Sequence, residues 1–317
     1  MTRSGFVALA EEYLSLRRGL GFALVTQGRL LLDFARWADL CGHQSPLTID
    51  LAVSWARSSG RGGPANAAKR LTVVRGFARH CAGRDPVTEI PPAGLLGAPT
   101  RRKPPHIYSD AEIAELLRVA ATLRPRGGLR PHTYVTLFAL LASTGLRVSE
   151  GRRLTCSDVD LQRGVLTVRE SKFRKSRLVP LHPSALEPLR HYGAHRESCR
   201  SVPRSEFFFR AESAPCLTLS AVETTFRRLR RELGWTSEGR TRLPRLHDLR
   251  HTFASRRLLR WYEEGIDAHQ KVAVLATYLG HTHVTETYWY LTAIPELLAV
   301  AGQRFERFAD RGRGSTS

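Results

Sequence analysis

Six side chains in four separate segments of the chain could act on a phosphate group. They are Arg147 in "STGLRVSEGRRL", Lys172 in "SKFRKS", His247 and Arg250 in "LPRLHDLRHTFAS", and His281 and Tyr290 in "LGHTHVTETYWYL". A guanidinium donates paired hydrogen bonds to phosphate, lysine and histidine transfer protons, and a tyrosine hydroxyl can be a nucleophile. Taken singly, each residue also fits an ordinary role as a solvated charge, a core histidine or a packing aromatic.

The aromatic run at the end of the fourth segment narrows the choice. Tyr288, Trp289 and Tyr290 are consecutive. Three consecutive residues cannot share one buried face of a helix, because neighbouring helical positions point in different directions. Either one or two of them are surface anchors, or one points outward for chemistry.

The net charge indicates what these groups act on. Lysine and arginine number 49 against 29 acidic residues, which gives a formal charge of +20. A positive field of this size favours a polyanionic partner, and a nucleic acid fits better than a membrane surface. A high-GC genome would explain part of the arginine excess but not so large a net charge.

Other classes of protein lack support in the sequence. No apolar run approaches the roughly 18 residues that indicate a membrane helix, and the first residues do not resemble a signal peptide, so we expect a cytoplasmic protein. The five cysteines are scattered without CxxC spacing, and there is no HExxH or GxxxxGK motif. We therefore expect no metal and no cofactor.

The elements that must position these groups fall into two parts. Residues 1–85 contain amphipathic helical patterns interrupted at glycines, which predicts a small helical domain. Residues 86–106 contain six prolines and a basic cluster, a composition typical of an extended linker. The second domain is expected over 107–317.

The second domain is predicted to be mainly α with a small β-sheet, an α+β fold. Ser109 and Glu112 form a capping-box pattern before an apolar run, and a further helix is expected to end at Gly145. "GVLTVRE" and "RLVPLH" alternate in hydrophobicity and flank the polar "SKFRKS", which predicts a β-hairpin. His247 and Arg250 are spaced to share one face of a later helix.

Together and in this order, the four segments resemble the tyrosine recombinase (phage integrase) family. The phrases that carry the resemblance are "TGLRVSE", "HDLRHTFAS" and "LGHTHVTETYWYL" within about residues 107–291. The resemblance implies the catalytic set Arg147, Lys172, His247, Arg250, His281 and the nucleophile Tyr290. It also implies that Glu150 supports the site, which we interpret as orienting the His247–Arg250 box, and that residues 1–85 are a core-binding domain.

The family's chemistry implies an enzyme that cuts and rejoins DNA through a 3′-phosphotyrosine link. The arginines would neutralise the non-bridging oxygens, and Lys172 would protonate the departing 5′ oxygen. The implied partner is double-stranded DNA at a specific recombination site, on which the protein assembles with itself into a tetramer. The ending of the chain favours a mobile element or phage as its source.

Some alternatives remain open. The hairpin has Ser171 and Phe173 around Lys172 where glycines are common in the family, so Lys175 competes for the role of general acid. The apolar stripe within 295–317 either closes its own domain or docks on a neighbouring protomer. The competing functions are a catalytically silent DNA-binding protein of the same fold and a type IB topoisomerase-like relaxing enzyme.

The two lysines can be told apart by changing the leaving group. A strand with sulfur at the bridging 5′ position leaves as a weakly basic thiolate, which needs little protonation. We expect Lys172→Ala to cleave normal DNA slowly and to recover on the sulfur-substituted strand, and Arg250→Ala not to recover. If Lys175→Ala recovers instead, Lys175 is the general acid.

Overall fold

The computed structural model describes ten stretches of the chain, and for 268–269 and 289–292 it describes the backbone alone. These stretches are 5–43, 46–60, 63–98, 104–169, 176–199, 205–212, 214, 216–236, 243–281 and 283–292. The chain divides into two compact units, Met1–Arg102 and Lys103–Ser317. The division falls within the proline-rich stretch 86–106. No helix of the described residues is long and apolar enough to cross a membrane.

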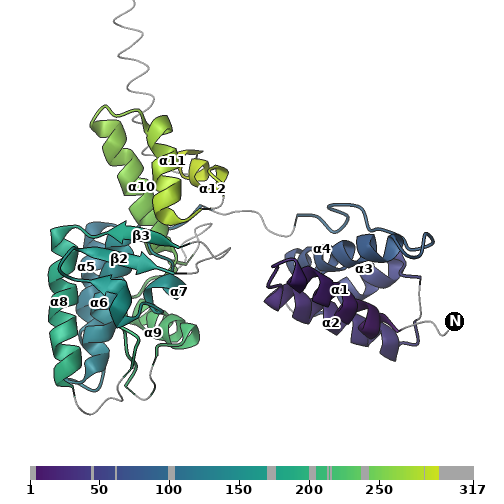
Figure 1. Ribbon diagram of the computed structural model, residues 1–317, viewed down its shortest axis with the longest axis horizontal. Coiled ribbons are helices and arrows are strands. Elements are labelled where there is room, and N and C mark those ends of the chain that lie inside the picture. The colour runs from purple at the N-terminus through teal and green to yellow at the C-terminus, as the bar shows by residue number, and fades with distance from the viewer. Residues whose placement is uncertain are drawn as a thin grey trace, which may run out of the picture. The chain divides into compact units, whose positions relative to one another are not determined.

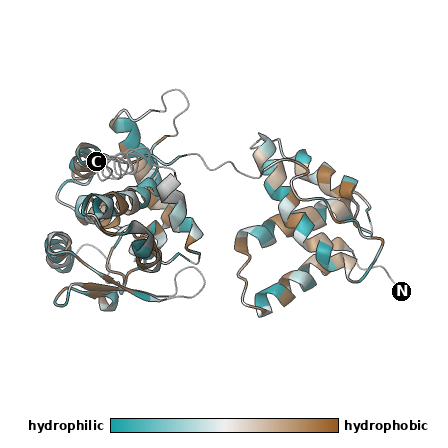
Figure 2. Cartoon of the chain, turned by 90° about the horizontal axis from the view of Figure 1, so that it is seen from above, coloured by the Kyte–Doolittle hydropathy of each residue, from teal (hydrophilic) through white to brown (hydrophobic). Residues whose placement is uncertain are grey.

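The first unit contains four described helices (Figure 1). They are α1 (Phe6–Gly19), α2 (Val25–Leu40), α3 (Ile49–Ser58) and α4 (Gly63–Ala82). Each buries residues at helical spacing, such as Phe6, Ala10 and Leu14 of α1. Mixed brown and teal residues along each helix in Figure 2 reflect this amphipathic pattern.

Side-chain contacts fix the ends of these helices. Asp39 of α2 accepts hydrogen bonds from the backbone N–H groups of Phe6 (2.8 Å) and Val7 (3.1 Å), which begin α1. These N–H groups have no partner within their own helix, and a carboxylate there also complements the helix dipole. Thr48 caps α3 in the same way by accepting from Leu51 N.

The second unit is mainly helical with one small sheet, as the sequence predicts. Its described helices are α5 (Asp110–Ala120), α6 (Leu129–Thr144), α7 (Val148–Gly151), the 3-10 helix η1 (Cys156–Asp158), α8 (Pro183–Ser198), α9 (Leu219–Glu232), α10 (Asp248–Glu263), α11 (Ala268–Leu279) and α12 (Thr285–Thr292). The strands β1 (Val159–Asp160), β2 (Val165–Val168) and β3 (Arg177–Pro180) form an antiparallel sheet in that order.

The predicted hairpin is confirmed, with Val168 of β2 paired to Arg177 of β3 at the end nearest the connecting loop. The capping box of Ser109 and Glu112 is also confirmed at the start of α5. Residues 170–175, including Lys172 and Lys175, lie outside the described residues. The structure therefore describes both strands that lead into the loop but not the two candidate general acids.

Helix α6 is the centre of this unit and contacts α5, α7, α8 and α10. It buries residues on several sides, including Leu137, Phe138 and Leu141, which is the pattern of a helix surrounded by protein. A smaller cluster of Leu258, Val272 and other apolar residues packs α10 against α11. The second unit thus places the end of α6 beside α10 and α11.

Candidate active site

The site begins at the turn after α6. Gly145 ends the helix in the left-handed region, with φ 64°. A Cβ there would lie 2.5 Å from Phe253 Cδ1 and 3.1 Å from Leu279 Cδ2, so both the backbone conformation and the space require glycine. This close approach brings Arg147, two residues later, beside α10 and the end of α11.

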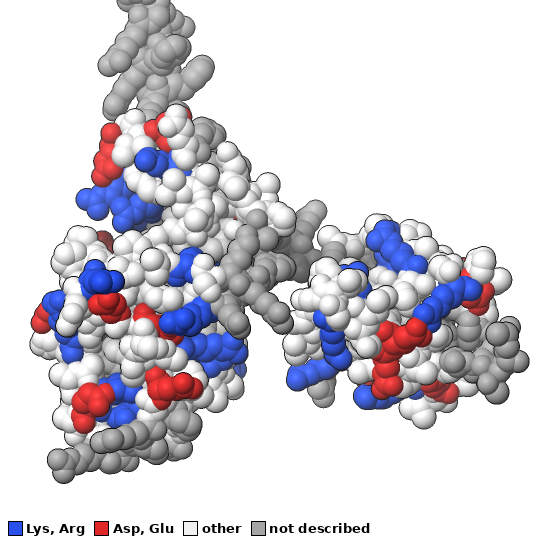
Figure 3. Space-filling view, in the orientation of Figure 1, with Lys and Arg blue, Asp and Glu red and all other residues white. Residues whose placement is uncertain are grey.

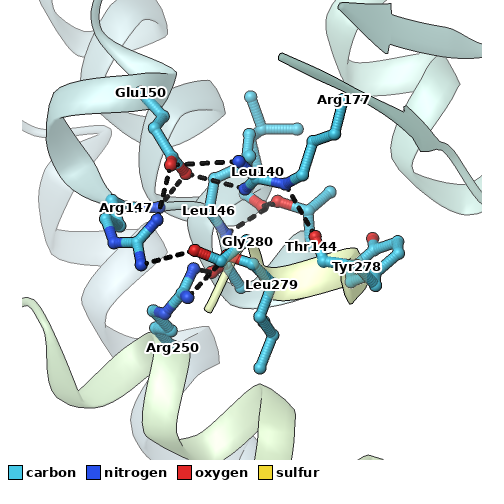
Figure 4. A network of polar contacts seen from close by, with 11 residues as sticks. Leu140, Thr144, Leu146, Arg147, Glu150, Arg177, Arg250, Tyr278, Leu279 and Gly280 are labelled. Atoms are coloured by element: carbon cyan, nitrogen blue, oxygen red, sulfur yellow. Dashed lines mark hydrogen bonds and ion pairs between the residues drawn. The ribbon is translucent and has the colours of Figure 1, made fainter. Parts of the chain in front are cut away.

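Arg147 is held from two sides. Its Nη1 donates to Glu150 Oε1 (2.8 Å) and its backbone N–H donates to Glu150 Oε2 (2.9 Å). Its Nη2 donates to the carbonyl oxygen of Gly280 (3.0 Å), 133 residues later in the chain. Figure 4 shows the guanidinium of Arg147 between these two acceptors.

Arg250 is anchored in the same place from α10. Its Nη1 donates to the carbonyl oxygen of Gly145 (2.7 Å) and its Nη2 to that of Leu279 (2.7 Å). Its exposed fraction is only 2%. A guanidinium carries five N–H donors in a fixed plane, so two bonds to carbonyl oxygens set the direction of the others.

His247 is the N-cap residue of α10 and has helical backbone angles, φ −66° and ψ −20°, and its carbonyl oxygen accepts a hydrogen bond from the backbone N–H of Arg250 (3.1 Å). Its ring makes an edge contact with His251 with centroids 4.9 Å apart. The loop before it is fixed by buried Asp248, which accepts from the backbone N–H of Arg245 (2.8 Å) and from its Nη2 (2.7 Å).

His281 connects the site to α12. Its Nδ1 lies 2.7 Å from the hydroxyl of Thr287, which is fully buried. Thr287 precedes Tyr290 by three residues, less than one helical turn. The backbone of Tyr290 lies within α12, and its side chain lies outside the described residues.

Tyr288 and Trp289 are the aromatic residues directly before Tyr290 on α12. Tyr288 is 41% exposed, which fits one of the surface positions that a run of three consecutive aromatics requires. Its position on α12 turns it away from the core side that buries Thr287. The side chain of Trp289 lies outside the described residues.

The sequence analysis expects Glu150 to orient the His247–Arg250 box, but the structure places its carboxylate against two other arginines. Its four hydrogen bonds come from Arg147 and Arg177 instead. The reason is geometric, because Glu150 lies on the short helix α7 that Arg147 begins, and β3 brings Arg177 to the opposite side of the carboxylate. These guanidinium groups outweigh burial and lower the pKa of Glu150 to about 2.

Two residues of this cluster were missed by the sequence analysis. Arg177 pairs with Glu150, and His251 contacts the ring of His247. The only sequence feature that could have indicated Arg177 is its position as the first residue of the second predicted hairpin strand. His251 follows Arg250 directly, but a histidine within a helix carries no distinctive pattern.

The three histidines of the cluster have lowered pKa values. Desolvation, followed by the positive charge of Arg250, lowers the pKa of His281 to about 3, and desolvation with the same charge lowers that of His247 to about 4. Desolvation and the neighbouring His247 lower the pKa of His251 to about 3. All three rings are therefore neutral near pH 7.

A cleft of about 470 Å³ opens beside these groups, between α7, α9 and the loop before α10. Its lining includes Arg147 and His247 together with Arg227 and Arg230 of α9 and Arg245. Figure 3 shows blue side chains over the region of α7 and α9. The arrangement suits an anion with an extended charge, and the described residues contain no group of three ligands that could hold a metal ion.

The histidines predict how the free energy of unfolding varies with pH. Their folded pKa values lie below the ordinary value of 6.5, so the unfolded chain binds protons that the folded chain excludes. Stability is fully present above pH 6.5 and falls as the pH drops toward 4. The slope stays below about 1.4 kcal/mol per pH unit for each ring, because each ring takes up at most one proton.

Urea unfolding at pH 7.0 and 5.5 measures this change. We expect His251→Phe to lose less stability between the two pH values than the unchanged chain does. Glu150 does not interfere, because its pKa of about 2 keeps it ionised throughout. An equal loss in both proteins would contradict the assignment.

The comparisons with known proteins agree with this geometry. Residues 109–296 match the model of the phage integrase family. The chain is 42% identical over 309 residues to y4rB, a Sinorhizobium fredii protein named as an integrase/recombinase, covering 96% of this chain and 98% of the relative. It is 30% identical over 287 residues to the tyrosine recombinase XerD of Bradyrhizobium diazoefficiens, covering 85% and 86%.

Solved structures share the fold at low sequence identity. The Tn1549 transposon integrase in complex with transposon right end DNA has a TM-score of 0.67 and 17% identity, covering 95% of this chain and 99% of that one. The XerH site-specific recombinase bound to its difH substrate has a TM-score of 0.65 and 18% identity, covering 89% and 79%. The family match and the long relatives show that this chain belongs to the phage integrase, or tyrosine recombinase, family of enzymes.

Proposed function

We propose that this protein is a site-specific DNA recombinase that cuts and rejoins DNA through a 3′-phosphotyrosine at Tyr290. The observation that carries the proposal is the meeting of Arg147 and Arg250 at the end of α11, directly before His281. His281 is in turn bonded to α12, the helix that includes Tyr290. Residues from three separate segments thus converge on one place.

The reaction exchanges one phosphate ester for another. The phenolic oxygen of Tyr290 bonds to phosphorus, and the bond from phosphorus to the 5′ oxygen breaks. The phenolic proton passes to a neutral histidine, and Lys172 gives a proton to the departing 5′ oxygen. Rejoining is the reverse, so the phosphotyrosine conserves the ester bond and no external energy source is required.

The two arginines suit the transition state of this reaction. Negative charge collects on the non-bridging oxygens as the attacking oxygen approaches, and preorganised donors lower the barrier most where they need not move. The carbonyl anchors of Arg147 and Arg250 provide such preorganisation. The lowered pKa values of His247 and His281 keep both rings neutral, so either can accept the tyrosine proton.

The proposed partner is double-stranded DNA at a specific recombination site. The +20 charge and the arginines of the cleft support it, and a lambda integrase dimer bound to a core site shares the fold. Residues 1–85 would be the core-binding domain, 86–106 the linker and 107–317 the catalytic domain. We further propose that the protein assembles with itself into a tetramer on DNA.

The proposed biological setting is a mobile element or phage, with the enzyme acting in the cytoplasm. Its support is the fold shared with a transposon integrase and the similarity to a Sinorhizobium fredii integrase/recombinase.

The nucleophile is tested with a nicked suicide substrate that traps the covalent adduct on a denaturing gel. Tyr290→Phe should lose the adduct and keep its affinity for DNA, because only the attacking oxygen is removed. Tyr288→Phe is the matched control on the same helix and should form the adduct. Loss of the adduct with Tyr288→Phe and its retention with Tyr290→Phe would overturn the proposal.

The same assay in EDTA tests whether the negative charge on the phosphate oxygens is neutralised without a divalent metal ion. We expect adduct formation to continue, because arginines take the place of a divalent ion, while a magnesium-dependent nuclease in the same buffer stops. Affinity for DNA should fall steeply with salt as phosphate contacts release counterions. Strict dependence of cleavage on a divalent ion would refute this mechanism.

A further inference from the structure

We infer that Arg177 is a positioning residue for the proposed strand cleavage, acting on Arg147 through Glu150 and on the segment before His281 through Tyr278. The inference rests on the proposed function. Arg177 belongs to β3, 27 residues after Glu150 and 101 residues before Tyr278, so it connects parts of the chain that no local structure joins.

The contacts of Arg177 are directed into the protein. Its Nη1 and Nη2 donate to Glu150 Oε1 (3.1 Å) and Oε2 (2.9 Å), a paired arrangement that fixes both planar groups. Its Nε donates to the carbonyl oxygen of Tyr278 (2.7 Å). The side chain is 10% exposed, against 18% for Arg147. Figure 4 shows Arg177 on the far side of Glu150 from Arg147.

Glu150 transmits this constraint to Arg147. Each of its oxygens accepts one hydrogen bond from Arg177 and one from Arg147. The carboxylate therefore cannot turn without breaking a bond to one arginine. Without the paired contact from Arg177, Glu150 would be free to rotate toward Arg147 and to draw its guanidinium out of line.

The second connection is through the end of α11. The last carbonyl groups of a helix have no N–H partner within the helix and carry the negative end of its dipole. Arg177 binds the carbonyl of Tyr278, Arg250 that of Leu279 and Arg147 that of Gly280. Three consecutive carbonyl groups thus set the positions of three arginines that come from three different elements.

Gly280 allows the guanidinium of Arg177 to approach the backbone after α11 closely. Its φ is 68°, and a Cβ there would lie 2.7 Å from Nη1 and 3.0 Å from Cζ of Arg177. The guanidinium therefore packs directly against the backbone that leads to His281. Any displacement of Arg177 is transmitted to this backbone, and with it to His281.

The first measurement separates binding from cleavage in the full chain. Arg177→Lys keeps the charge but replaces the planar fork with a single point of contact. We expect affinity for the DNA site to stay within about threefold, because Arg177 faces protein acceptors. The rate of adduct formation should fall by about 100-fold, the effect of a misplacement near 1 Å.

Arg196→Lys is the matched control for lost stability. Arg196 is a buried arginine of α8 that donates to the carbonyl oxygens of Ser205 (2.7 Å) and Phe207 (3.2 Å) outside the site. The Arg196→Lys variant should lower the unfolding temperature about as much as Arg177→Lys does. It should nevertheless cleave DNA at the rate of the unchanged chain. If both variants lose cleavage in proportion to stability, Arg177 is only structural and the inference fails.

A substrate change identifies which step Arg177 serves. A methylphosphonate at the scissile position removes the negative charge that Arg147 neutralises, so misplacement of Arg147 matters less. The defect of Arg177→Lys should shrink at least tenfold on this substrate, as should that of Arg147→Ala. A defect of equal size on both substrates would overturn the positioning role. Adduct formation by Tyr290→Phe would instead overturn the proposed function.

Discussion

The carbonyl oxygens of Tyr278 and Leu279 at the end of helix α11, and of Gly280 directly after it, each accept a hydrogen bond from a different arginine. Because these arginines belong to β3, α10 and the start of α7, the helix end fixes three elements relative to one another. It also orients two guanidinium groups beside His281. A feature that every helix must resolve, its unpaired last carbonyls, here sets the geometry of the site.

This arrangement depends on two close approaches that leave no room for a side chain. Gly145 meets Phe253 and Leu279, and Gly280 meets Arg177. Both glycines also adopt positive φ, and both offer their carbonyl oxygen to a site arginine. Backbone in contact with guanidinium groups is stiffer than side chains alone would be, which suits donors that must already be in place when charge develops.

The electrostatics of the site favour an anion. Of the site arginines, Arg147 and Arg177 share the single carboxylate of Glu150, and Arg245 pairs with Asp248. The excess positive charge and partial burial lower the pKa values of the three histidines. An anion between the arginines would offset that charge and raise the same pKa values.

The sequence by itself determined the mainly helical fold class, the hairpin, the helix end at Gly145 and the family. These follow from local patterns, since hydrophobic periodicity, capping residues and short motifs act over a few neighbouring positions. It did not determine which acceptors hold the arginines. The pairing of Glu150 with Arg177 and the three carbonyl anchors join residues that lie between 27 and 133 positions apart. Only the packing of α7, β3, α10 and α11 decided them, because a hydrogen bond between distant residues leaves no periodic trace in the sequence.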